Sequence, residues 1–102
     1  MDKLIRDGKV AVIVSPEHGA GWSTWSKSSQ AMCMDERIVS ALLYDGENKA
    51  KEVAEKLFPD AFIAGQKLTV EWLPVGTIFE IQEYDGAETI RVIASLDDFM
   101  IA

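Results

Sequence analysis

The sequence predicts an α+β domain, in which a mainly antiparallel sheet of about four strands carries two helices on one face. A short apolar run near the N-terminus predicts a buried strand, and two amphipathic segments in the middle predict helices. The last third alternates polar and apolar residues, as antiparallel strands do. The chain has 102 residues, so we expect a single domain spanning 1–102, because domains commonly contain about 100–150 residues.

The first strand is predicted at residues 10–14, which read Val-Ala-Val-Ile-Val. Continuous apolar runs are typical of strands that are buried on both faces, so we expect this strand at the centre of the sheet. The dipeptide Asp7-Gly8 just before it is a turn signal. It predicts a small hairpin with Leu4 and Ile5.

Two helices are predicted in the middle of the chain. The first begins at Asp35, a preferred N-cap residue, and ends at Asp45-Gly46; the second runs from about Asn48 to Pro59. Each has an apolar stripe that needs covering, and the sheet is the expected partner. The stripes contain Ile38, Val39, Leu42 and Leu43 in the first helix and Ala50, Val53, Ala54 and Leu57 in the second.

The C-terminal third predicts three more strands. Residues 68–72 alternate as a half-buried strand, and residues 73–76 form a turn with Pro second and Gly fourth. The strongest local signal is Asp85-Gly86 between two alternating runs, which predicts a two-residue hairpin loop and fixes its register. The tail, residues 96–102, is expected to pack through Phe99 and Ile101. The predicted pairs are Glu83 with Glu88, Gln82 with Thr89, Ile81 with Ile90, Glu80 with Arg91, and Phe79 with Val92.

The charge is unevenly spread along the chain. The net charge is −7 at pH 7; residues 1–34 contain four basic and three acidic residues, whereas residues 35–102 contain six and fourteen. Duplex nucleic acid requires a basic stripe, so we expect no such partner. The acidic part of the chain either keeps the protein soluble or meets a basic protein partner.

Several other classes are excluded. The longest apolar run is far shorter than the ~18 residues of a membrane span, and charged residues occupy the N-terminus where a signal peptide would be apolar. We therefore expect a cytoplasmic protein without a membrane partner. The single cysteine, Cys33, has no disulfide partner and is expected to be a small buried apolar filler between Met32 and Met34. No spacing suits a metal or a cofactor, so none is expected.

The candidate site is the loop that follows the first strand. Residues 15–29 contain two glycines, five serines, a threonine, two tryptophans, a lysine and the only histidine. Backbone N–H and hydroxyl groups suit phosphate or carboxylate oxygens, and tryptophan stacks on a base with ~1–3 kcal/mol per base. The composition predicts a nucleotide-like ligand. The candidate residues are His18, Gly19, Gly21, Trp22, Ser23, Thr24, Trp25, Ser26 and Lys27, with Arg6 as a further cation.

Two alternatives remain open for this loop. Trp22 and Trp25, three residues apart, are equally consistent with core residues of a turn that covers the sheet. His18 could act as a catalytic base with Glu17, or activate Cys33 as a nucleophile, but no third group is spaced to orient such a pair. The loop also lacks the third glycine of a dinucleotide fingerprint and the Gly-Lys-Ser of a P-loop. We therefore favour a non-enzymatic role over an enzyme and assign no catalytic residue.

Two acidic pairs are expected to be solvated. Glu83 and Glu88 face each other beside the hairpin turn, with Asp85 close by, and could hold a divalent cation. Solvation at the tip of the hairpin is the expected state. The second pair, Asp97-Asp98, is expected on the surface.

Four segments resemble a family of short bacteriophage and prophage proteins: RDGKVAV at 6–12, GAGWSTW at 19–25, WLPVGTIF at 72–79 and EYDG at 83–86. The resemblance implies a phage accessory protein in the cytoplasm of the host bacterium. Small acidic phage proteins often counter host defence. Some of them sequester nucleotide-derived immune signals, usually as homo-oligomers, and others block a host protein.

The function expected from these observations is non-enzymatic binding of a nucleotide-like ligand through the loop. The alternative is an acidic inhibitor that contacts a host protein. A small enzyme that uses His18 and Glu17 is the third hypothesis.

Overall fold

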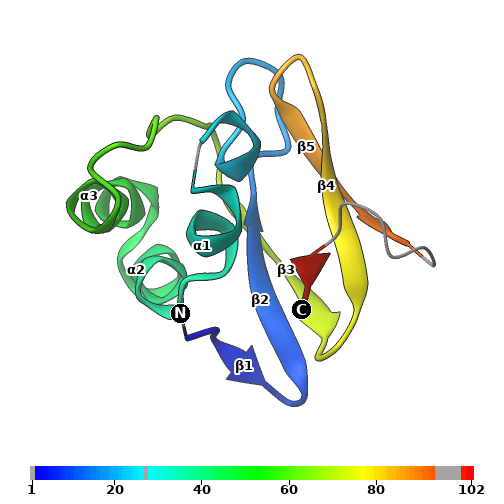
Figure 1. Cartoon of the computed structure of the whole chain (residues 1–102). Coiled ribbons are helices and arrows are strands. Elements are labelled where there is room, and N and C mark those ends of the chain that lie inside the picture. The colour runs from blue at the N-terminus through cyan, green and yellow to red at the C-terminus, as the bar shows by residue number, and fades with distance from the viewer. Residues whose placement is uncertain (1, 27, 94–99) are drawn as a thin grey trace.

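The computed structural model describes residues 2–26, 28–93 and 100–102, which form two three-stranded antiparallel sheets and three α-helices (Figure 1). The α+β class is confirmed. The sheets replace the single four-stranded sheet that the sequence predicts, and a third helix is added. The elements are β1 (Ile5–Arg6), β2 (Lys9–Val14), the 3-10 turn η1 (Ser23–Trp25), α1 (Ser29–Met34), α2 (Glu36–Asp45), α3 (Glu47–Leu57), β3 (Thr69–Pro74), β4 (Ile78–Tyr84), β5 (Ala87–Val92) and β6 (Met100–Ile101).

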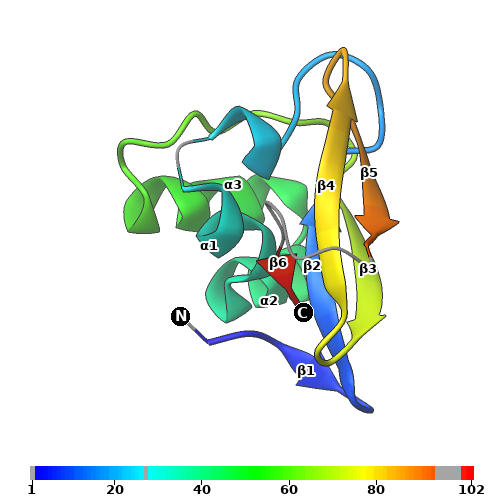
Figure 2. The same cartoon turned by 45° about the vertical axis from the view of Figure 1, so that its right-hand side comes forward.

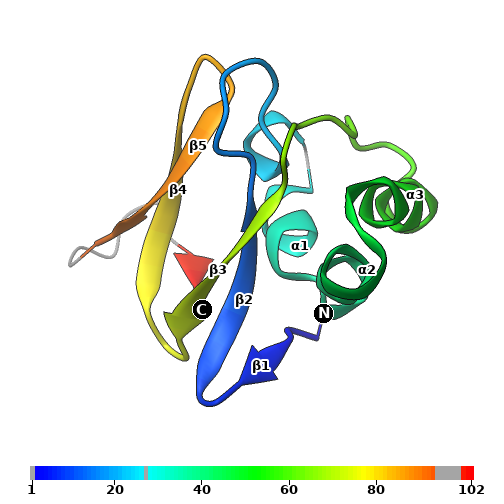
Figure 3. The same ribbon diagram turned by 180° about the vertical axis from the view of Figure 1, so that it is seen from behind.

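Strand β2 is the centre of the molecule, as its continuous apolar run predicts. It lies between β1 and β3 in the first sheet (Figure 3). Its residues alternate between two cores: Ala11 and Ile13 pack with the helices, while Val10 and Val12 pack toward the second sheet. The predicted Asp7-Gly8 turn to β1 is also confirmed, with both residues at positive φ.

The second sheet has the order β5-β4-β6 and lies on the side of β2 away from α2 and α3 (Figure 1). Figure 2 turns this sheet toward the viewer. The predicted hairpin register is confirmed pair by pair, including Glu80 opposite Arg91 and Glu83 opposite Glu88. After the turn that follows β3, the chain crosses to the other face of β2 instead of pairing β4 with β3. A short turn leaves both arrangements open, which is why the sequence does not distinguish one sheet from two.

Helices α2 and α3 match the predicted segments, and Asp35 is confirmed as the N-cap of α2. Its carboxylate accepts the backbone N–H of Arg37 at 2.9 Å and the Arg37 guanidinium at 2.8 Å. Burial by itself would raise the pKa of Asp35, but these hydrogen bonds outweigh it and hold the pKa below its ordinary value.

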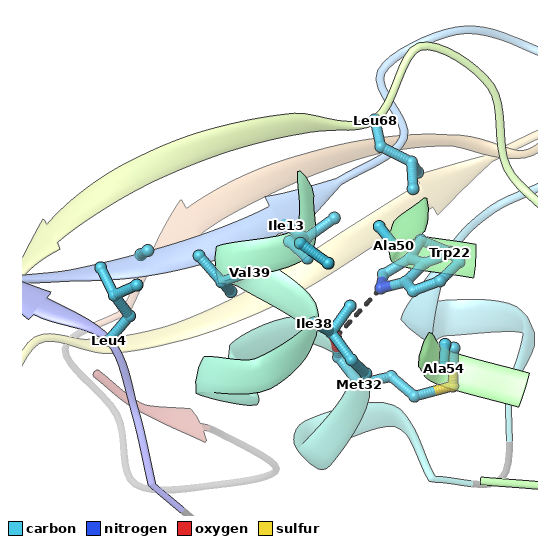
Figure 4. Packing of buried hydrophobic residues seen from close by; sticks show 11 residues of the cluster. Leu4, Ile13, Trp22, Met32, Ile38, Val39, Ala50, Ala54 and Leu68 are labelled. Carbon is cyan, nitrogen blue, oxygen red and sulfur yellow. Dashed lines mark hydrogen bonds between the residues drawn. The ribbon is translucent and has the colours of Figure 1, made fainter. Parts of the chain in front are cut away.

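The sequence misses helix α1. Its residues Met32, Cys33 and Met34 are all buried, so the segment shows no polar face and no amphipathic period. Met32 belongs to the core under the helices (Figure 4), whereas Cys33 and Met34 belong to the core between the sheets.

The end of the chain differs from the prediction where it is described. Ile101 is about half exposed, and the following Ala102 is buried instead. The backbone of Ala102 bonds to both Gly76 and Thr77, which fixes the end of the chain against the turn after β3. The predictions for Phe99 and for Asp97-Asp98 lie outside the described residues. Within the described segments, no helix is both long enough and apolar enough to cross a membrane.

Cys33 is buried, as predicted, and its burial has a measurable consequence at high pH. Desolvation raises the pKa of its thiol from 9.0 to about 12. In the unfolded chain the thiol loses its proton near pH 9, whereas the folded protein keeps it, so folding stability decreases as the pH rises above 9. We expect Cys33 to contribute a loss of up to about 1.4 kcal/mol per pH unit.

Urea unfolding between pH 8 and pH 11 measures this loss. The free energy of unfolding of the wild type is expected to fall more steeply than that of Cys33→Ala, since other titrating groups are common to both. Parallel curves for the two proteins would contradict a buried thiol.

Candidate functional site

The candidate loop does not stand free in solvent: residues 15–26 lie over the turn of the β4–β5 hairpin (Figure 1). The N–H of Gly19 donates to the carbonyl oxygen of Asp85 at 2.8 Å. Gly86, at φ +84°, lies so close that a Cβ atom there would clash with the carbonyl group of Gly19. The close approach of the two segments therefore requires glycine in the hairpin turn.

A buried carboxylate, Glu88, holds the loop on the hairpin. The side chain is only 1% exposed. Its Oε1 accepts the N–H of Ser15 at 2.8 Å, and its Oε2 accepts the N–H of Thr24 at 3.0 Å and the Thr24 hydroxyl. The backbone N–H of Glu88 donates to the carbonyl oxygen of Ser15 at 2.8 Å. The prediction that Glu88 is solvated beside Glu83 is wrong, because these loop donors satisfy it inside the protein.

Most of the loop donors on which the ligand prediction depends are therefore already used. The hydroxyl of Ser15 donates to the loop backbone and accepts the N–H of Gln66 at 2.9 Å. The N–H of Ser26 donates to the carbonyl oxygen of Ser23, and its hydroxyl accepts the N–H of Ser28. Gly21 packs against Glu88, 3.2 Å from where a Cβ atom would lie. The chemistry that the sequence predicts for an external anion is fulfilled by the protein's own carboxylate. Lys27 lies outside the described residues.

The two tryptophans have different roles. Trp22 is fully buried, and its indole N–H donates to the carbonyl oxygen of Met32 at 3.1 Å (Figure 4). In a continuous helix this carbonyl would accept the N–H of Glu36. The chain bends after α1, however, and the N–H of Glu36 donates to the carbonyl oxygen of Asp2 instead, which leaves the Met32 carbonyl available. Trp22 is therefore a core residue, which is the second of the two interpretations that the sequence allows. Ser23 beside it is also buried. Neither residue is accessible to a ligand.

Trp25 does reach the surface. It is 40% exposed, and its ring stacks on Phe62, which is 57% exposed, with centroids 6.2 Å apart and 25° between the planes. Its indole N–H donates to Oε2 of Glu83 at 3.1 Å, which fixes the orientation of the ring. Tyr84 follows Glu83 and faces the opposite side of the strand. Its ring forms a T-shaped contact with the ring of the exposed His18, with centroids 6.0 Å apart. We call His18, Trp25, Phe62 and Tyr84 the aromatic end.

The sequence does not reveal Phe62 and Tyr84 as members of this surface. Phe62 lies in the long connection between α3 and β3, and only the fold brings it against Trp25. Tyr84 occurs inside the hairpin signal, where its alternation predicts an outward position but no contact with the loop.

Arg6 does not belong to this site. It lies in β1, at the other end of β2, and the six residues of that strand span about 20 Å. Its guanidinium lies 5.4 Å from the ring of Tyr44 and 5.8 Å from that of Trp72, and it donates a hydrogen bond to the Tyr44 hydroxyl. These contacts join β1 to α2 and β3, so the role of Arg6 is structural.

The arrangement does not support catalysis by the predicted pair. The carboxylate of Glu17 forms an ion pair with Lys67 at 3.0 Å, so it does not orient His18. Cys33 is buried with a raised pKa, whereas a nucleophilic thiol needs a lowered one. Over residues 2–26, 28–93 and 100–102, no group of three or more His, Cys, Asp or Glu side chains is placed to hold a metal ion.

Comparisons of the chain with protein-family models, with curated proteins and with solved structures found no match. The resemblance to phage proteins therefore stays a prediction, and the function has to be argued from the surface that the fold presents.

Proposed function

We propose that this protein is a small non-enzymatic binding protein that contacts a basic partner protein through its aromatic end. One observation carries the proposal: the exposed Trp25–Phe62 stack lies beside the carboxylate of Glu83, while the donors of the loop are engaged by Glu88. The loop thus positions an aromatic surface rather than an anion-binding cradle.

The chemistry of this surface favours a protein as the ligand. Tryptophan and tyrosine are enriched among the residues that dominate protein–protein binding energy, because they bury much area and lose little entropy. Carboxylates around such residues select a partner of positive charge and speed its association. Glu83 and Asp85 supply them here, in a chain whose net charge is −7. In the setting that the phage resemblance implies, the partner is a host protein and the role is counter-defence in the host cytoplasm.

A nucleotide-like ligand is the second candidate, because the exposed ring of Trp25 offers a face on which a base can stack. Most of the loop donors that would bind a nucleotide are already engaged, and Arg6 lies at the other end of β2. A homo-oligomer would therefore have to supply the groups that bind the phosphates of the nucleotide.

The test combines capture from host lysate with calorimetry on the purified partner. The captured protein should be basic, and its affinity should fall steeply with salt. Trp25→Ala and Phe62→Ala are each expected to weaken binding by at least about tenfold, whereas Tyr44→Ala, an exposed aromatic at the other end of β2, should not.

Three results would contradict the proposal. Trp25→Ala could bind the partner like the wild type, or Tyr44→Ala could weaken binding equally. The third is a thermal shift with mono- or cyclic nucleotides that is lost in Trp25→Ala, which would favour the nucleotide candidate.

A further inference from the structure

The outward face of the β4–β5 hairpin carries a shallow hollow of about 580 Å³. Its lining includes Glu80, Gln82 and Tyr84 from β4, with Ala87 and Thr89 from β5. These residues alternate with the buried Phe79 and Glu88, so they project from the face of the hairpin that points away from the core.

The shape of the hollow follows from the cross-strand pairs. Ala87 lies directly opposite Tyr84, and its short side chain leaves space beside the tyrosine ring. Tyr84 is 78% exposed, and the edge contact with His18 supports its ring from the side of the loop. Gln82 and Thr89, the next pair along, provide an amide and a hydroxyl.

Glu80 supplies the carboxylate on the outward face of the hollow, in a chain whose net charge is −7. Glu83 also borders the hollow, but its carboxylate lies on the other face of the hairpin, where it accepts the indole N–H of Trp25. The cation nearest to Glu80 is Arg91, whose guanidinium is 60% exposed and 3.5 Å from the carboxylate, a long surface pair of little strength. The Gln82 amide donates to the same oxygen, Oε1, at 3.4 Å. Within the described segments, the other carboxylate oxygen of Glu80 accepts no hydrogen bond.

We infer that this hollow takes an arginine side chain from an extended basic segment of the partner, an inference that rests on the proposed function. The Tyr84 ring offers a face for a cation, and arginine stacks on such faces through its planar guanidinium. The carboxylate of Glu80 accepts N–H groups of the same guanidinium. Gln82 and Thr89 are positioned to bond the backbone of the segment. A second copy of this chain is disfavoured as occupant, because two chains that each carry a net charge of −7 repel each other.

Fluorescence anisotropy with a labelled nonapeptide of alternating arginine and glycine tests the inference. A lysine version and a glutamine version serve as probe controls. Ala87→Leu fills the hollow without changing the charge and is expected to weaken binding of the arginine peptide by about tenfold or more. Glu80→Gln should weaken it about three- to tenfold, whereas Glu55→Gln, at an exposed position on α3, should weaken it less than about twofold.

Tyr84→Leu is a second variant that keeps the bulk but removes the aromatic ring, should Ala87→Leu disturb the hairpin. It is expected to abolish the preference for the arginine peptide over the lysine peptide. The inference is overturned if Ala87→Leu, folded by circular dichroism, binds the arginine peptide like the wild type. It is also overturned if Tyr84→Leu keeps the preference, or if Glu80→Gln and Glu55→Gln weaken binding equally, which would indicate non-specific attraction to an acidic protein.

These outcomes are separate from those of the proposed function. Trp25 lies on the other side of the hairpin and should not affect binding of the peptide. If partner binding still requires Trp25 while peptide binding is unaffected by changes in the hollow, the proposed function stands and this inference fails. If partner binding does not depend on Trp25, the proposed function fails, regardless of the peptide result.

Discussion

Replacing Glu88 with alanine is expected to lower the free energy of unfolding by about 3–5 kcal/mol. The variant leaves the N–H groups of Ser15 and Thr24 without their acceptor in a buried place, and each unsatisfied buried donor costs about 1–3 kcal/mol. It also removes the charged side chain that joins the loop to β5. For a domain with a typical stability of about 5–15 kcal/mol, this loss is a large fraction of the total.

Chemical denaturation measures the loss, and Glu83→Ala is the matched control. Glu83 is the cross-strand partner of Glu88 in the same hairpin, but it is exposed. It accepts the indole N–H of Trp25 and, over a longer distance of 3.3 Å, the N–H of Gly86. Its replacement should cost about 1 kcal/mol or less. Glu88→Gln should fall between the two, because the amide keeps one acceptor oxygen but turns a donor toward the loop. Equal losses for Glu88→Ala and Glu83→Ala would contradict the buried carboxylate.

The parts of the fold that the sequence predicts well are those that neighbouring residues determine. Asp85-Gly86 sets the register of the hairpin because the turn allows only one pairing of the flanking residues. Asp35 caps α2 through a donor two residues away, and the β2 run is apolar because both of its faces are covered. In each case the signal and the structure it produces lie within a few residues.

The loop shows what local patterns cannot determine. Glu88 is 73 residues from Ser15 and 64 residues from Thr24, so nothing near any of them indicates the contact. A glutamate next to a turn is ordinarily solvated, and the exception arises from the fold. The composition of the loop indicates donors that suit a carboxylate, but the carboxylate that they bind comes from the chain itself. Likewise, the spacing of Trp22 and Trp25 fits a core pair and a binding pair equally well.

Replacing Trp22 with alanine should destabilise the protein by about 3–5 kcal/mol, the usual cost of removing a large buried aromatic side chain. The indole is fully buried among Ile13, Met32 and Ala50 in the core under the helices, as Figure 4 shows. Its loss also leaves the Met32 carbonyl without a donor at the end of α1. Chemical denaturation followed by circular dichroism measures the effect. Trp22→Phe, which keeps most of the bulk but no N–H, should lose less.

Trp25→Ala is the matched control, because it distinguishes a tryptophan that stabilises the fold from one that contacts the partner. Its ring is partly exposed, so its replacement should cost about 1 kcal/mol while removing the surface that we propose contacts the partner. A folded Trp22→Ala variant of nearly wild-type stability would contradict the core assignment and restore Trp22 as a candidate ligand contact. A Trp25→Ala variant that unfolds would make the Trp25–Phe62 stack structural and would remove the observation that carries the proposed function. Because the two tryptophans lie three residues apart in one loop, opposite outcomes for the pair would show that the loop is a rigid support for a single exposed aromatic surface.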